Sequence, residues 1–168
     1  NGKNPTRLTS DPGYQGNPVW SPDGTRIAYV QGRDAKRDIM VMDADGSNPQ
    51  PLTTLATSAD YSPAWSPTGS QIAFVSNRGG NADIYVVDVT CIGSSDVCDQ
   101  QAVNLTSANQ GDDLDPAWSP DGSQLVFASV RDSAANADLY TMAADGSNVA
   151  RITATDGDER FPSWWAPQ

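Results

Sequence analysis

The chain has 168 residues, enough for one domain with a sizeable core, and 21 acidic against 10 basic residues give it a net charge of −11. This charge argues against nucleic acid as a partner and favours cationic partners. The sequence contains no run of about 18 apolar residues, so we expect no membrane-spanning helix. Because it neither begins with Met nor shows a basic-then-apolar leader, we expect a processed chain or a piece of a longer one.

In chain order, residues 1–17 are predicted to hold the end of one repeat unit and a loop, and residues 18–53 form the first full repeat. The expected strands of that repeat are 18–20, 25–31, 38–42 and 49–53. The sequence S-P-D-G at 21–24 predicts a tight turn, because proline presets φ and glycine accepts a positive φ. The apolar run within 25–31 is typical of a strand that is buried on both faces.

The same pattern recurs at 63–106 and 116–153, and residues 154–168 begin a further copy that stops after its first strand. Its most regular feature is a P-x-W motif, whose tryptophans are spaced by 45, 53 and 46 residues: Trp20, Trp65, Trp118 and Trp164. A period of about 40–45 residues is that of one propeller blade. We therefore predict an all-β propeller of four-stranded blades in a single domain over residues 1–168. It would have three complete repeats and part-blades at 1–17 and 154–168.

The two cysteines, Cys91 and Cys98, lie in an insertion that lengthens the second repeat. Two thiols without any histidine make a poor zinc site. We predict a disulfide between them, which would stabilise the chain by about 2–3 kcal/mol. The alternative is two free thiols in a cytosolic chain, whereas a disulfide indicates a periplasmic or extracellular location.

Several parts of each repeat together carry a resemblance. The P-x-W-S-P-[DT]-G motif, an I-A-[FY] strand, a D-[IL]-Y strand, a D-G-S-N turn and a closing L-T resemble the WD40-like propeller repeat (PD40) of the TolB family over nearly the whole chain. The resemblance implies a propeller fold. TolB-like propellers occur as periplasmic protein-binding modules, and similar repeats occur in propellers that are attached to peptidases.

The repeated tryptophans could suggest carbohydrate binding, but packing between blades explains them better, because one blade cannot bury its own face. Two further series of charged residues recur. Arginines end the second strand of each repeat and aspartates begin the third, so we expect ion pairs across each hairpin. The arginines are Arg33, Arg78 and Arg131, and the aspartates are Asp38, Asp83 and Asp138.

The loops before each P-x-W motif are expected to ring one mouth of the central channel, because the first strand of each blade lines the channel. Their acidic residues are the candidate site: Asp60, Asp113, Asp115 and Glu159. A negative mouth would bind a basic peptide segment or a hard cation. We expect no cofactor, with Ca²⁺ as the one candidate ion. The alternative is that these acids only keep the chain soluble.

Catalytic machinery is missing from the sequence. Without histidine no Ser-His or Cys-His nucleophile system can form, and neither a G-x-S-x-G elbow nor a Gly-rich phosphate loop occurs. We therefore predict a non-catalytic module that binds a protein or peptide. The alternatives are the accessory propeller of a hydrolase whose catalytic domain lies outside this chain, and a self-assembling surface protein.

The blade count raises a separate expectation about association. Known propellers close with about four to eight blades. Three blades with two part-blades would leave apolar end faces exposed, and such faces mark interfaces. We expect self-association or a longer propeller.

Overall fold

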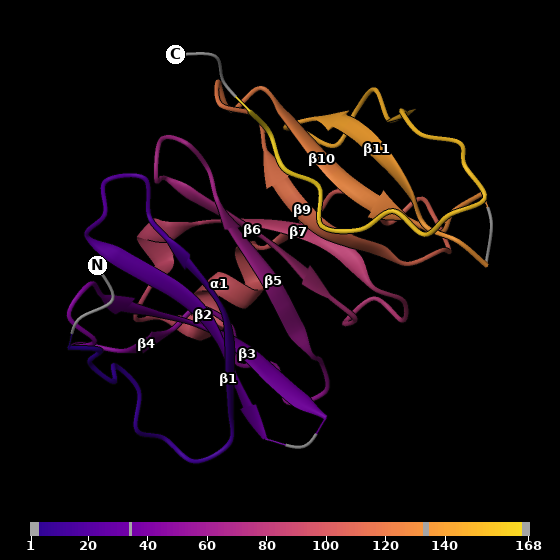
Figure 1. Ribbon diagram of the computed structural model, residues 1–168. Coiled ribbons are helices and arrows are strands. Elements are labelled where there is room, and N and C mark those ends of the chain that lie inside the picture. The colour runs from indigo at the N-terminus through magenta and orange to yellow at the C-terminus, as the bar shows by residue number, and fades with distance from the viewer. Residues whose placement is uncertain (1–3, 34, 133–134, 166–168) are drawn as a thin grey trace.

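The computed structural model describes residues 4–33, 35–132 and 135–165. They form three four-stranded antiparallel sheets that follow one another along the chain, as Figure 1 shows from indigo to yellow. In each sheet the strands lie in the order of the sequence, so every blade is an up-and-down meander. The predicted all-β propeller class and its four-stranded blades are confirmed.

The strands have the following bounds. The first blade consists of β1 (Tyr14–Trp20), β2 (Arg26–Arg33), β3 (Lys36–Asp43) and β4 (Gln50–Pro51). The second consists of β5 (Asp60–Trp65), β6 (Gln71–Ser76), β7 (Asp83–Asp88) and β8 (Val103–Asn104). The third consists of β9 (Asp113–Trp118), β10 (Gln124–Ser129), β11 (Asp138–Ala143) and β12 (Ala150–Arg151). A 3-10 turn, η1 (Val89–Cys91), and one helix, α1 (Ser95–Gln101), lie between β7 and β8.

The two part-blades differ from the prediction. The part-blades at 1–17 and 154–168 were each expected to contain one strand, at 6–9 and at 161–164, but neither of these segments has strand structure. A β-strand needs a neighbour for its backbone hydrogen bonds, and both segments lie where the middle strands of a further blade would have to supply them. Each segment instead runs across an end of the blade array.

The S-P-D-G turn forms as predicted between β1 and β2. Gly24 adopts a φ of 70°, and its backbone N–H donates to the carbonyl oxygen of Ser21 at 2.9 Å. The Ser21 hydroxyl donates to Asp23 at 2.6 Å, and this bond with those from Thr25 lowers the pKa of Asp23 to about 2. The motif therefore fixes its own turn by side-chain bonds, which explains why it recurs.

The core lies between the blades rather than within them. Phe74 and Phe127 are fully buried, and each stacks on a tyrosine of the next strand, Tyr85 or Tyr140, with ring centroids 5.8 Å apart. One cluster joins residues of the first and second blades, and another joins the second and third. This arrangement buries both faces of the second blade.

The tryptophans confirm the packing role inside the array but not at its ends. Trp65 and Trp118 are each 9% exposed, whereas Trp20 is 58% exposed and Trp164 is 36% exposed. The indole N–H of Trp118 donates to the carbonyl oxygen of Ala64 in the preceding blade at 3.2 Å. No blade precedes Trp20 among the described residues, so its ring lies at the surface.

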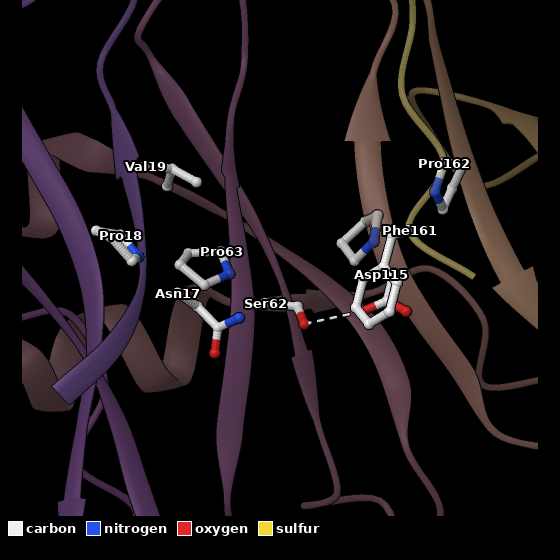
Figure 2. A pocket seen from close by; sticks show the side chains of 9 residues that line it. Asn17, Pro18, Val19, Ser62, Pro63, Asp115, Phe161 and Pro162 are labelled. Atoms are coloured by element: carbon white, nitrogen blue, oxygen red, sulfur yellow. Dashed lines mark hydrogen bonds between the residues drawn. The ribbon is translucent and has the colours of Figure 1, made fainter. Parts of the chain in front are cut away.

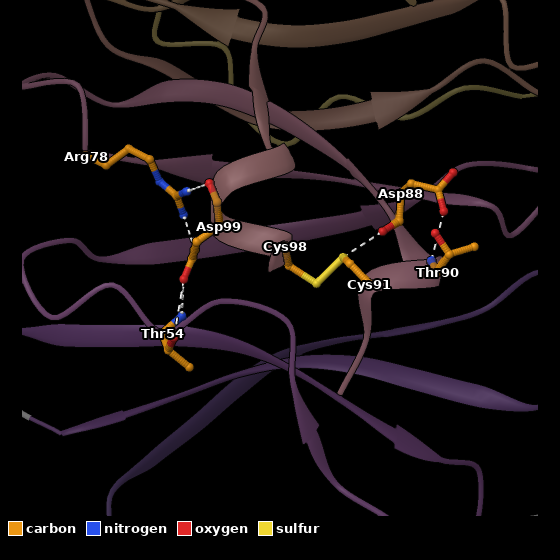
Figure 3. Close-up of a disulfide and its surroundings, with 7 residues drawn as sticks. All are labelled: Thr54, Arg78, Asp88, Thr90, Cys91, Cys98 and Asp99. Carbon is orange, nitrogen blue, oxygen red and sulfur yellow. Dashed lines mark hydrogen bonds and ion pairs between the residues drawn. A yellow bond between two sulfur atoms is a disulfide. The ribbon is translucent and has the colours of Figure 1, made fainter. Parts of the chain in front are cut away.

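The insertion in the second repeat is held by the predicted disulfide, which is present between Cys91 and Cys98. Figure 3 shows that the next residue, Asp99 of α1, reaches across to the first blade. Its carboxylate accepts from the backbone N–H of Thr54 at 2.9 Å and pairs with Arg78 at 3.1 Å. The insertion thus links the first and second blades.

Over the described ranges, no helix is long and apolar enough to cross a membrane.

Candidate functional site

The first strands of the blades converge on a pocket of about 260 Å³. Its lining comes from the same short stretch of four successive repeats: Asn17, Pro18, Val19, Ser62, Pro63, Asp115, Pro116, Phe161 and Pro162. In Figure 2 the labelled residues of β1, β5, β9 and the C-terminal segment lie next to one another along this pocket. The pocket is therefore axial, on the side where the sequence places the channel.

One residue from each repeat forms what we call the axial ring: Asn17, Ser62, Asp115 and Phe161. Each lies directly before the motif proline, and their φ angles are 48°, 50°, 53° and 55°. This left-handed region is uncommon for residues other than glycine, and asparagine tolerates it best. A serine, an aspartate and a phenylalanine there imply strain of about 1–3 kcal/mol each.

In the three blades the left-handed residue lies at a bulge in the first strand, and Phe161 adopts the same φ in a segment without strand structure. The pairing of β1 with β2 shifts register between Gly16 and Val19, and that of β5 with β6 shifts between Tyr61 and Ala64. A bulge inserts an extra residue and re-aims the side chain there. Since the same device recurs in β9, it directs one side chain per repeat into the pocket. Repeated strain of this kind is a mark of a functional surface.

The axial ring offers mixed chemistry. The Ser62 hydroxyl donates to Oδ1 of Asp115 at 3.1 Å, a bond drawn in Figure 2. Asn17 adds an amide, and the ring of Phe161 is 78% exposed. A half-buried carboxylate beside an open aromatic ring can accept hydrogen bonds from a cationic or amide group and stack on its apolar part.

Two of the four predicted acids are not at the mouth. Asp60 and Asp113 are fully buried, and their carboxylates pair with Arg78 at 3.1 Å and Arg131 at 2.9 Å. The bulge turns the residue before each proline toward the pocket and leaves the residue three before it inside the sheet. Burial raises the pKa of Asp60, although the Arg78 guanidinium opposes the shift. These two carboxylates are buried structural anchors.

The other two predicted acids lie apart from each other. Asp115 lines the axial pocket. Glu159 is half-buried and accepts from the Thr153 hydroxyl at 2.9 Å, and its backbone N–H donates to the carbonyl oxygen of Ala137 at 2.9 Å. Of the predicted set, only Asp115 is in the pocket. The other ring members could have been found from their common place before the motif proline.

The predicted hairpin ion pairs are also wrong in the second and third blades. Arg78 and Arg131 turn away from Asp83 and Asp138 and lie over the stacked aromatic pairs, 4.9 Å from the Tyr85 ring centroid and 4.7 Å from that of Tyr140. Asp138 pairs with Arg151 at 2.6 Å instead. In these two blades, contacts with the aromatic rings and with the buried acid replace the ion pair across the hairpin.

The described parts of the chain contain no cluster of side chains that could form a metal site. There, no three acidic or cysteine side chains gather closely enough to hold a metal ion. The Ca²⁺ expectation stays a prediction.

Comparison with known proteins defines the class. The family model described as the TolB beta propeller domain (PD40) matches residues 2–107, more than half of the chain. The chain therefore belongs to the TolB beta-propeller family, as the repeated motif had suggested.

Solved structures agree with this fold. TolB from Acinetobacter baumannii aligns with a TM-score of 0.79 at 23% identity, covering 96% of this chain and 38% of that one. A protein assigned as TolB from Agrobacterium tumefaciens aligns with a TM-score of 0.68 at 28% identity, covering 85% of this chain and 47% of that one. A puromycin-hydrolyzing peptidase of Mycobacterium tuberculosis aligns with a TM-score of 0.73 at 14% identity, covering 95% and 25%. The chain thus spans less than half of each of these proteins.

Proposed function

We propose that this chain is a non-catalytic, extracytoplasmic binding module. Its axial ring would bind a peptide segment that carries a cationic side chain. The observation that carries the proposal is the fourfold use of a strained, left-handed residue to line one pocket. Packing alone does not require that strain, because the tryptophans and aromatic pairs already fill the junctions between blades.

The chemistry of the pocket favours a peptide side chain as the ligand. Asp115 supplies the negative charge, and a lysine or arginine head group could bond to it while its methylene stem lies on Phe161. Asn17 and Ser62 can bond to the peptide backbone. At about 260 Å³ the pocket suits one or two side chains rather than a folded domain.

One finding supports a location outside the cytoplasm, and two others support the binding of a partner. The disulfide between Cys91 and Cys98 closes a short insertion, and disulfides persist mainly in oxidising compartments. Membership of the TolB beta-propeller family agrees with a protein-binding role. The overall charge of −11 would draw cationic partners toward the pocket.

The test uses two short fluorescein-labelled peptides of equal length, one lysine-rich and one glutamate-rich, with affinity read by fluorescence anisotropy. We expect the native chain to prefer the lysine-rich peptide, and the affinity to weaken as salt is added. Asp115→Asn should weaken binding about 5- to 10-fold, in line with the loss of one charged contact. Asp96→Asn, which removes an exposed charge on α1, is the matched control and should leave the affinity unchanged.

Equal loss in both variants would mean that net charge and not the axial ring binds the peptide. Equal affinity of the native chain for both peptides would count against the proposal as well. Phe161→Ala adds a charge-neutral check, because its exposed ring contributes contact area without changing the field.

A second candidate is the accessory propeller of a hydrolase. The likeness to the puromycin-hydrolyzing peptidase supports it at the level of the fold. In that case the catalytic groups would lie outside these 168 residues, which contain no histidine. The axial pocket would then admit a substrate rather than retain a partner.

A further inference from the structure

A second opening, of about 560 Å³, lies at the outer rim of the junction between the second and third blades. We call it the rim groove. Both blades that form it are complete four-stranded sheets, and it shares no lining residue with the axial pocket. Five of its lining residues decide its chemistry: Val86, Asp88, Val103, Leu105 and Asp145.

The junction of the first two blades has a corresponding surface. The strand register places Val41 there where the rim groove has Val86. Leu52 and Leu105 also correspond, because each donates its backbone N–H at 2.8 Å to an isoleucine carbonyl of the adjacent strand. Leu52 is fully buried, whereas Leu105 is half-buried. The same surface is therefore covered at one junction and open at the other.

The insertion of the second repeat provides that cover. Its Ile92 packs against the core cluster that contains Val41 and Leu52. Gly93 lies beside β4, since a Cβ built on it would come within 3.8 Å of the side-chain oxygen of Gln50. The chain itself thus shows that a short segment with a branched aliphatic side chain fits this surface.

The third blade has a tight turn where the second blade has the insertion. In this turn Gly146 donates its backbone N–H to the carbonyl oxygen of Ala143 at 2.9 Å. The turn contacts Leu105 but leaves Val103 58% exposed. An exposed apolar surface with a charged margin is typical of an interaction site.

The margin of the rim groove is negative. Asp88 from the second blade and Asp145 from the third are both exposed. Hydrogen bonds from Thr90, chiefly from its backbone N–H, lower the pKa of Asp88, and bonds from Ser147, chiefly from its hydroxyl, lower the pKa of Asp145. None of the described residues that line the groove is basic. A positively charged occupant would complement these two carboxylates.

The covered junction differs from the rim groove in charge. Thr90 takes the place of Asp145 there. Asp43, the counterpart of Asp88, accepts from the Asn48 side chain of its own turn at 2.7 Å. The insertion that covers this junction accordingly contains neither lysine nor arginine. An aliphatic side chain therefore suits both junctions, whereas a cationic one suits the rim groove alone.

We propose that the rim groove binds a peptide segment of a partner protein in which an aliphatic side chain is flanked by lysine or arginine. The aliphatic side chain lies on Val86 and Leu105, and the cationic groups pair with Asp88 and Asp145. At about 560 Å³ the groove has room for more than one side chain. Because it is separate from the axial ring, this proposal does not depend on the peptide binding proposed there.

Titration of the isotope-labelled 168-residue chain with three synthetic peptides, followed by two-dimensional NMR, tests the proposal. The peptides have the same glycine-serine frame and the central sequences Lys-Ile-Lys, Lys-Ser-Lys and Glu-Ile-Glu. The Lys-Ile-Lys peptide should shift the amides of Val103, Leu105 and Asp145 until they saturate. The other two should leave these amides unchanged, because each lacks one of the two features.

A lysine placed in the groove should block it. Val103→Lys should abolish the peptide-induced shifts at Leu105 and Asp145, because its own ammonium group can pair with the carboxylates. Val103 is 58% exposed and lysine is common on edge strands, so the variant can fold. Val149→Lys is the matched control: it adds the same charge at a residue that is 41% exposed outside the groove, and its affinity should equal that of the native chain.

Removing one carboxylate should have a smaller effect. Asp145→Asn should weaken binding of the Lys-Ile-Lys peptide at the groove about 5- to 10-fold. Asp45→Asn, the same change in the corresponding turn of the first blade, should leave this affinity unchanged. Asp115→Asn in the axial ring should also leave it unchanged, so failure of this proposal and failure of the axial proposal are distinguishable.

Four results would overturn the proposal. They are groove amides that stay unshifted by the Lys-Ile-Lys peptide at every soluble concentration, equal shifts with the Lys-Ser-Lys peptide, equal loss of binding in Val103→Lys and Val149→Lys, and groove amides that shift with the concentration of the chain alone. In the last case a second copy of the chain is the occupant. If Val103→Lys does not fold, Asp145→Asn with its control carries the same test.

Discussion

The first blade and the third blade are built on the same motif but use it differently. In the third blade Arg131 lies over the rings of Phe127 and Tyr140 and pairs with the fully buried Asp113. In the first blade the corresponding arginine, Arg33, is exposed, and Gln15 stands at the position of the acid. The two repeats thus differ because the first blade has Gln15 in place of the acid and Met40 in place of the tyrosine that hold Arg131 in the third blade.

The largest expected effect separates the tryptophans of these two blades. Trp118→Ala should lower the free energy of unfolding by about 3–5 kcal/mol, because it removes a buried aromatic ring from the junction. Trp20→Ala should cost about 1 kcal/mol or less, as expected at an exposed position. Urea denaturation measures both. Equal losses would mean that the end face of the first blade is covered as fully as the inner junctions.

The buried acid of the third blade gives the next comparison. Asp113→Ala should cost about 3 kcal/mol, because it leaves the Arg131 guanidinium inside the blade without its carboxylate. Gln15→Ala, the matched change in the first blade, should cost less than about 1 kcal/mol. If thermal unfolding finds equal stability in the two variants, the Asp113 carboxylate does not anchor the blade. The prediction that Asp113 is a surface charge at the channel mouth would then be restored.

Much of this architecture could be predicted from the sequence. The P-x-W-S-P-D-G motif carries its own turn bonds, so the blades and their hairpins followed from local chemistry. The disulfide followed from two cysteines in one insertion. The place of Asp60 and the left-handed φ of Ser62 did not, because a bulge leaves no signature when the bulged residue is not glycine.

The partners of the arginines were missed for a different reason. The predicted pair of Arg78 with Asp83 took account only of the hairpin. The Arg78 guanidinium instead bonds to Asp60, 18 residues earlier, and to Asp99 in the insertion. Those contacts depend on how strands of one blade and its insertion come together. The spacing of 18 residues recurs between Arg131 and Asp113, so the repeats carry a signal for the first contact, whereas the contact with Asp99 occurs only in the second repeat.

The disulfide distinguishes the junction of the first two blades from the next one. Cys91→Ser with Cys98→Ser should cost about 2–3 kcal/mol, because it frees the insertion that carries Asp99. The backbone N–H of Thr54, which donates to Asp99 at 2.9 Å, should then exchange with solvent deuterium faster. Amides between the second and third blades, such as that of Asp113, which donates to the carbonyl oxygen of Ala82 at 2.7 Å, should keep their protection. Uniform loss of protection would mean that the bond stabilises the whole chain and not this junction.

Acid titration gives the smallest effect and again contrasts an exposed with a buried carboxylate. Bonds from Ser119 and Ser123 lower the pKa of Asp121 from 3.8 to about 2, so ionised Asp121 stabilises the fold above pH 3.8 and this contribution is lost as pH falls through about 2. Burial raises the pKa of Asp60, so its contribution is greatest in acid and declines as pH rises through that raised pKa.

The two variants should therefore change the pH dependence in opposite directions. Asp121→Asn should flatten the fall in stability below pH 3.8, and Asp60→Asn should remove part of the decline above it. Urea denaturation at a series of pH values measures both slopes. Parallel slopes in the two variants would contradict the assigned environments. The second repeat provides a natural control, because Thr68 replaces the turn aspartate there and does not titrate.

Peptide binding at the axial ring is the central proposal. Titration of the isotope-labelled chain with the lysine-rich peptide, followed by two-dimensional NMR, tests this residue by residue. We expect the largest shifts at the amides of the axial ring, Asn17, Ser62, Asp115 and Phe161, while the exposed acidic turns at Asp45 and Asp145 stay unchanged. Shifts spread over the acidic turns with none at the axial ring would contradict it.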